Sequence, residues 1–110
     1  MTVTTVIEFL EVQGKRVRIA RRFKNLTQAQ LAQELVKLLG ESFDDAKVSR
    51  IEKGAQDVTS RELSALSMIL EQSRDWLAGE PDATFNDRVN PRYRDTTVGR
   101  AAYTPSLAAA

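Results

Sequence analysis

The feature that most constrains the fold is a repeated pairing of helix-start and helix-stop signals. Thr27 is followed three residues later by Gln30, and Thr59 is followed in the same way by Glu62. Each pair is a capping box. The threonine hydroxyl accepts a hydrogen bond from the backbone N–H three residues later, and the Gln or Glu side chain there accepts one from the backbone N–H of the threonine. Gly40 follows the first of these helices as a stop signal. No segment shows the period-two alternation of a strand. We therefore expect an all-α fold.

Apolar spacing predicts five short helices, and a polar or glycine residue marks most of their ends. We expect helices over 12–24, from Thr27 to Gly40, over 45–53 with Asp44 or Asp45 as its cap, from Thr59 through Leu70, and after Ser73; Asn25 would end the first in a left-handed conformation. The inward side chains would be Val12, Val17, Ile19, Ala20 and Phe23, then Leu31, Ala32, Leu35, Leu38 and Leu39, then Val48 and Ile51, then Leu63, Leu66, Ile69 and Leu70, and finally Trp76 and Leu77.

Three regions are expected along the chain. Residues 1–11 are rich in β-branched side chains and would form an arm, a strand or an extension of the first helix. Residues 12–79 hold the compact domain. Residues 80–110 contain all three prolines and few aliphatic residues, which is typical of a tail that is partly disordered or ordered by a partner. Phe85, Tyr93 and Tyr103 in this tail have no assigned core.

The absence of cysteine and histidine restricts the chemistry. It removes disulfides, thiolate metal sites and the usual general base near neutral pH. We therefore expect no enzymatic activity and no cofactor. The longest apolar runs are far shorter than the roughly 20 residues that span a bilayer, so we expect a cytoplasmic protein without a membrane partner.

The charge of the chain is unevenly distributed. The formal net charge is only +1, but residues 15–24 hold six basic residues and no acid. Residues 12–53 hold ten basic and five acidic residues, a net charge of +5. Such a basic region fits a polyanionic partner. The alternative is a solvated helix face whose arginines pair with Glu8, Glu11 or Glu52.

Three stretches carry a resemblance to a known family. They are Gly14–Arg18 followed by Asn25–Gln28, then Leu31–Leu35 followed by Val48–Gly54, and then Leu63–Leu70 followed by Trp76–Gly79. Together they resemble the Cro/lambda-repressor-like (XRE family) helix-turn-helix regulators over residues 12–79. The resemblance implies a five-helix lambda-repressor-like domain and a homodimer that represses transcription at a double-stranded DNA operator, as bacterial and temperate-phage repressors do. One departure is a turn longer by about six residues between Val36 and Asp45.

The resemblance also implies which residues contact DNA. They are Thr27 and Gln28 at the start of the second helix, Asp45, Ala46, Lys47, Ser49, Arg50 and Lys53 on the recognition helix, and Arg16 in the basic region. Arg50 is the best candidate for reading a base, because a guanidinium matches guanine bidentately. It could instead pair with Glu34 or Asp57. We expect Glu52 to be structural and to hold a basic residue such as Arg21.

Other interpretations remain open. The domain could belong to an antitoxin whose 80–110 tail binds a toxin, or it could serve protein contacts alone. Trp76 is expected in the core, or at the edge of a dimer interface. The last residues Leu107, Ala108, Ala109 and Ala110 resemble a degradation tag read by a ClpX-type protease, although a small-residue end without function is the alternative.

Overall fold

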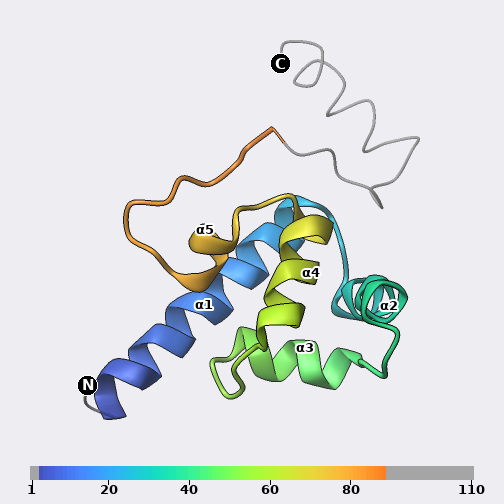
Figure 1. Cartoon of the computed structure of the whole chain (residues 1–110), viewed down its shortest axis with the longest axis horizontal. Helices are drawn as coiled ribbons and strands as arrows, with labels where there is room; N and C mark the ends of the chain where they lie inside the picture. Colours follow the sequence, from blue (N-terminus) through green and yellow to red (C-terminus); the bar gives the residue numbers. More distant parts are fainter. Residues whose placement is uncertain (1–2, 89–110) are drawn as a thin grey trace.

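Within the part of the chain that the structure describes, there are five α-helices and no strand (Figure 1). This computed structural model describes residues 3–88, with side chains from residue 7 onward. The helices are α1 (Val3–Phe23), α2 (Gln28–Leu39), α3 (Asp45–Glu52), α4 (Ser60–Leu70) and α5 (Arg74–Ala78). The predicted all-α, five-helix architecture is confirmed. None of the five helices combines the length and the apolar character needed to cross a membrane.

Most helix ends lie where the sequence signals place them. The capping boxes of Thr27 and Thr59 are both formed, and the Ser73 hydroxyl accepts from the backbone N–H of Trp76. Gly40 ends α2 with φ of 69°, and Asn25 follows α1 with φ of 65°, both in the left-handed region. These local signals act through the backbone groups that a helix leaves unpaired at its ends, so they operate independently of the tertiary fold.

Helix α1 differs from the expected helix in its length and in its buried face. It begins at Val3, so residues 3–11 continue the helix rather than forming a strand. Val12 and Ile19, predicted to point inward, are 39% and 52% exposed. The buried stripe has a helical spacing and contains both apolar and polar residues. Val17 and Ala20 were predicted correctly, and the other members are Gln13, Arg21 and Lys24. The prediction was wrong because it admitted only apolar residues to the buried face, whereas ion pairs allow charged residues there.

Lys24 illustrates how a charge enters this stripe. Its side chain is fully buried at the end of α1, and its ammonium donates to the carboxylate of Glu71. Glu71 is the left-handed residue that ends α4. The ion pair therefore ties together the C-terminal ends of two helices that are far apart in the sequence.

The core lies where α1 and α4 meet the other three helices. Helix α1 packs on α3 and α5, and α2 packs on α3 and α4. The most deeply buried apolar side chains come from all five helices; they include Val17, Leu31, Leu35, Val48, Leu66, Leu70 and Leu77. Trp76 is buried, as predicted, but Leu38 is 48% exposed and Glu34 occupies the inner face of α2 in its place. Leu38 is thus the third residue, after Val12 and Ile19, that the apolar pattern wrongly placed in the core.

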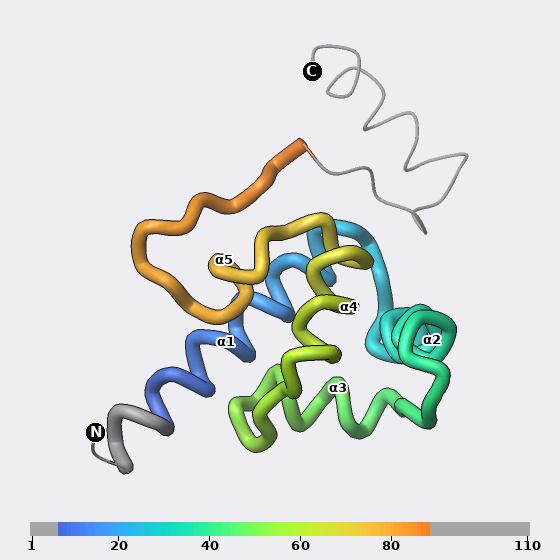
Figure 2. Tube along the Cα trace, viewed as in Figure 1, coloured from blue at the N-terminus to red at the C-terminus, as the bar shows by residue number. Residues whose placement is uncertain are grey.

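The segment after α5 packs back onto the helices. The ring of Phe85 lies 5.1 Å from that of Phe23, edge-on, and 4.8 Å from that of Trp76. The side-chain amide of Gln72 exchanges two hydrogen bonds of 2.8 Å with the backbone of Asn86. Figure 2 traces this segment in orange from the end of α5. Residues 80–88 of the expected tail thus cover part of the core, while Tyr93, Tyr103 and the proposed tag at Leu107–Ala110 lie outside the described residues.

Candidate nucleic-acid interface

The α2–α3 pair is fixed by caps at both helix starts and by small and branched side chains between the helices. Thr27 Oγ1 accepts from the backbone N–H of Gln30 at 3.1 Å. The carboxylate of Asp44 accepts from the N–H of Lys47 at 2.9 Å, so Asp44, one of the two candidates, caps α3. Ala32, Leu35, Val48 and Ile51 are all buried. Their packing sets the angle at which α3 leaves the surface.

A buried ion pair holds the end of α3 against α1. Arg21 donates to the two carboxylate oxygens of Glu52, from Nε at 2.6 Å and from Nη2 at 3.0 Å. A third donor of Arg21 reaches the carbonyl of Leu26 at 2.8 Å, and the Gln28 amide donates to Glu52 at 3.1 Å. The predicted structural role of Glu52 and its pairing with Arg21 are confirmed. The network links α1, α2 and α3 at one point.

Gly14 makes the close approach of α1 and α3 possible. A Cβ atom at this position would lie 2.5 Å from the carbonyl oxygen of Ile51 and 2.6 Å from that of Glu52. Both are backbone atoms at the end of α3, and they cannot swing aside as a side chain can. Any larger residue would therefore push α3 away from α1.

A concavity of about 600 Å³ lies where the second half of α1 meets the starts of α2 and α3. We call it the basic cleft; its charged and polar lining residues are Arg18, Arg21, Arg22, Thr27, Gln28, Asp45, Ser49, Glu52 and Lys53. Arg21 and Glu52 neutralise each other. Arg18, Arg22 and Lys53 are exposed, and their side chains form no ion pair or hydrogen bond with the described residues. Apart from the Arg21–Glu52 pair, the cleft therefore holds three positive charges and the single negative charge of Asp45, a net charge of +2.

The predicted contact residues of α3 differ in how free they are. Asp45, Ala46, Arg50 and Lys53 are exposed, whereas Ser49 is half-buried in the basic cleft. Arg50 donates from Nε to the Gln56 side chain at 2.9 Å on the exposed surface, rather than to Glu34 or Asp57.

Lys47 is held more firmly than Arg50. Its ammonium donates to the carboxylate of Glu62 at 2.7 Å and lies 4.4 Å from the centre of the Phe43 ring. Burial raises the pKa of Glu62, but hydrogen bonds from Lys47 and Thr59 outweigh it, so the pKa lies below its ordinary value of 4.5. The structure thus engages Lys47 in linking α3 to α4.

Arg16 is not brought to the basic cleft. Its guanidinium donates to the carbonyls of Trp76 at 2.8 Å and Glu80 at 2.9 Å, and it lies 5.2 Å from the centre of the Trp76 ring. Instead, Arg18 and Arg22 reach the cleft. Their spacing of four residues places them on one face of α1, and this signal in the sequence could have identified them as a pair.

The arrangement thus combines a basic concavity at a helix start with an adjoining exposed helix. Comparison of this chain with family models, with curated proteins and with solved structures gave no match.

Proposed function

We propose that this chain binds double-stranded DNA through the α2–α3 pair and acts as a transcriptional repressor by occupying an operator. The observation that carries the proposal is the basic cleft at the start of α2, directly beside the exposed side of α3. A helix held at a fixed angle beside a cationic anchor is the arrangement that a major groove accepts.

The basic cleft supports phosphate binding on electrostatic grounds. The side chains of Arg18, Arg22 and Lys53 form no ion pair with a described residue, and the single acid Asp45 leaves the cleft with a net positive charge. The first backbone N–H groups of a helix are unpaired within the helix, and they favour an anion at its N-terminus. The start of α2 opens into this same concavity through Thr27 and Gln28. Phosphate contacts of this kind would supply affinity without sequence preference.

The exposed side of α3 supports base recognition, and Arg50 is its principal candidate. The only side-chain bond that Arg50 makes to the described residues goes to a neutral amide at the surface, which a guanine could replace. Lys47 would first have to leave Glu62 and the face of Phe43. We therefore assign base reading to Arg50 rather than to Lys47.

In vitro selection from random duplexes, followed by fluorescence anisotropy on the selected site, tests the proposal. Replacing Arg18, Arg22 and Lys53 together with Gln should lower the slope of log affinity against log salt by about 3, since each phosphate contact contributes about 0.9. Lys15→Gln is the matched control, because Lys15 is exposed on the same helix but does not line the cleft. An unchanged salt slope in the triple variant, with unchanged circular dichroism, would contradict the phosphate assignment.

A second pair of variants separates base reading from phosphate binding. Arg50→Ala should weaken binding to the selected site by roughly tenfold to a hundredfold and leave random duplex almost unaffected, because one bidentate contact is worth about 1–3 kcal/mol of discrimination. Lys47→Ala should change that preference far less. Repression of a reporter that carries the selected site should follow the same order. Failure to select any site would refute sequence-specific binding.

A further inference from the structure

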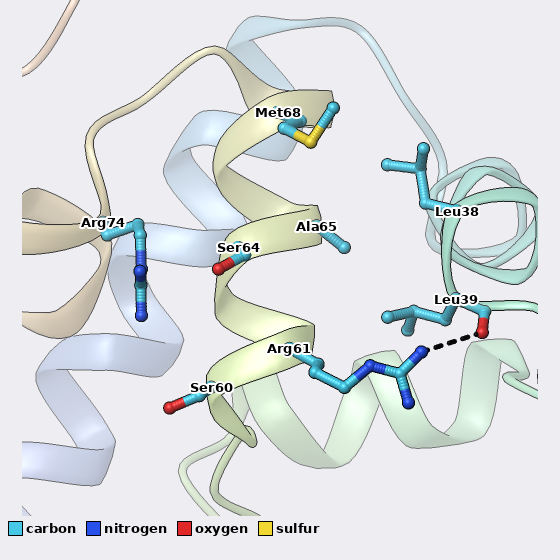
Figure 3. Close-up of a pocket in the computed structure, with 8 residues that line it drawn as sticks. All are labelled: Leu38, Leu39, Ser60, Arg61, Ser64, Ala65, Met68 and Arg74. Carbon is cyan, nitrogen blue, oxygen red and sulfur yellow. Dashed lines mark hydrogen bonds between the residues drawn. The ribbon is translucent and has the colours of Figure 1, made fainter.

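A shallow apolar groove between α2 and α4 lies apart from the basic cleft. Leu38 and Leu39 line it from α2, and Ala65 and Met68 line it from α4 (Figure 3). We call it the α2–α4 groove. Leu38 is 48% exposed and Met68 is 65% exposed, so two large apolar side chains face solvent side by side. Adjacent exposed apolar residues of this size are typical of contact surfaces.

Two arginines line this groove, and only one of them, Arg74, has no ion pair with the described residues. Arg61 donates to the carbonyl of Leu39 at 3.2 Å, and its other terminal nitrogen lies 3.7 Å from the carboxylate of Glu41. Arg74, at the start of α5, lines the groove beyond α4, and its side chain has no ion pair with the described residues. The groove therefore favours an apolar segment with acidic side chains.

The first turns of α1 have this complementary character. Ile7, Phe9 and Val12 are 49%, 44% and 39% exposed. Glu8 and Glu11 are exposed between them, and residues 1–14 contain no basic residue. We call residues 7–12 the α1 arm. Phe9 and Val12 lie three residues apart on one side of the helix, and Glu8 lies one turn before Val12.

The α1 arm cannot reach the groove of its own chain. Helix α1 is continuous from Val3 to Phe23, and close contacts hold it to α3 at Gly14 and place Val12 against Gly79. In Figure 1 the start of α1 and helix α2 lie on opposite sides of the molecule. An arm that fills the groove must therefore come from another molecule.

We propose that two copies of this chain associate by exchanging contacts, with the α1 arm of each docked in the α2–α4 groove of the other. The acidic residues of the arm face Arg74 at the rim, and Phe9 covers Leu38 and Met68. Two reciprocal contacts close the assembly as a two-fold dimer. The groove and the basic cleft share no lining residue, so the association is independent of the proposed DNA binding.

Sedimentation velocity of the full chain without DNA tests this interface. We expect a discrete dimer that dissociates on dilution. Met68→Glu and Phe9→Lys should each weaken dimerisation by at least about tenfold, because each places a charge in an apolar contact. Combining the two variants in one mixture should restore association in part, since the new charges are opposite. Ile19→Lys is the matched control, since Ile19 is equally exposed but belongs to neither surface.

Disulfide cross-linking identifies the contacting residues directly, because the natural chain has no cysteine. Phe9→Cys and Met68→Cys chains, oxidised as a mixture, should form the mixed covalent dimer in preference to either symmetric one. A monomer at every concentration, open-ended growth or preferential symmetric cross-links would overturn the proposal. Dimerisation that Ile19→Lys weakens as much as Met68→Glu would also overturn it.

Discussion

Gly14→Ala tests the packing of α1 on α3, because two opposing effects of known size meet at this position. In an unobstructed helix, alanine in place of glycine stabilises by about 1 kcal/mol. Here the new methyl group would lie 2.5 Å and 2.6 Å from two backbone oxygens of α3. Overpacking costs about 1–3 kcal/mol, and rigid backbone neighbours place this case at the upper end. We expect a net loss of about 2 kcal/mol in the free energy of unfolding.

Urea denaturation followed by circular dichroism and by the fluorescence of Trp76 measures this loss. The midpoint should fall while the slope stays unchanged. Gly40→Ala is the control, because its φ is +69° and no atom lies within 4 Å of its new Cβ. It should cost only the left-handed conformation, about 1 kcal/mol. If Gly14→Ala stabilised the protein instead, the backbone of α3 would not lie against Gly14 of α1, and the predicted overpacking would be refuted.

Three further changes test other contacts. Glu62→Gln should reduce the loss of stability in acid. The lowered pKa of Glu62 contributes stability that is fully present above the ordinary pKa of 4.5 and disappears as the pH falls through the pKa of the folded state. Thermal melts from neutral to acidic pH measure this loss. Glu52→Gln should destabilise by about 3–5 kcal/mol by leaving Arg21 buried without its counterion, and the paired replacement of both by apolar residues should recover most of that loss in urea melts. Phe85→Ala should cost about 1–2 kcal/mol and red-shift the emission of Trp76, and an unchanged spectrum would contradict the packing of residues 80–88 on the core.

The sequence predicted the helix ends well. It predicted less well which side of each helix is buried. Thr27, Thr59 and Ser73 start their helices as expected, because a cap depends on atoms within about four residues. Ile19 and Leu38 were misplaced, because an apolar residue beside the buried stripe has the same local signal as one within it.

The candidate site shows the same division. The sequence identified the basic region and the helix over 45–53, and it assigned Glu52 to Arg21. It did not identify which basic side chains are engaged in hydrogen bonds or ion pairs with other residues of the chain. Arg16 contacts Trp76 and the carbonyl of Glu80, a partner 64 residues away in the sequence. Lys47 is likewise held by a carboxylate on a different helix. No local pattern contains that information.

The sequence by itself determined the five helices, their caps and the concentration of positive charge between residues 15 and 24. It also determined the buried apolar residues of α4 and α5. These follow from periodicity and from backbone groups that must be satisfied locally. Only the tertiary structure decided which charges remain uncompensated at the basic cleft, which apolar side chains remain exposed at the groove, and that α1 extends past the body as an arm. Those outcomes depend on contacts between helices, in which burial and ion pairing select among side chains that the sequence alone leaves equivalent.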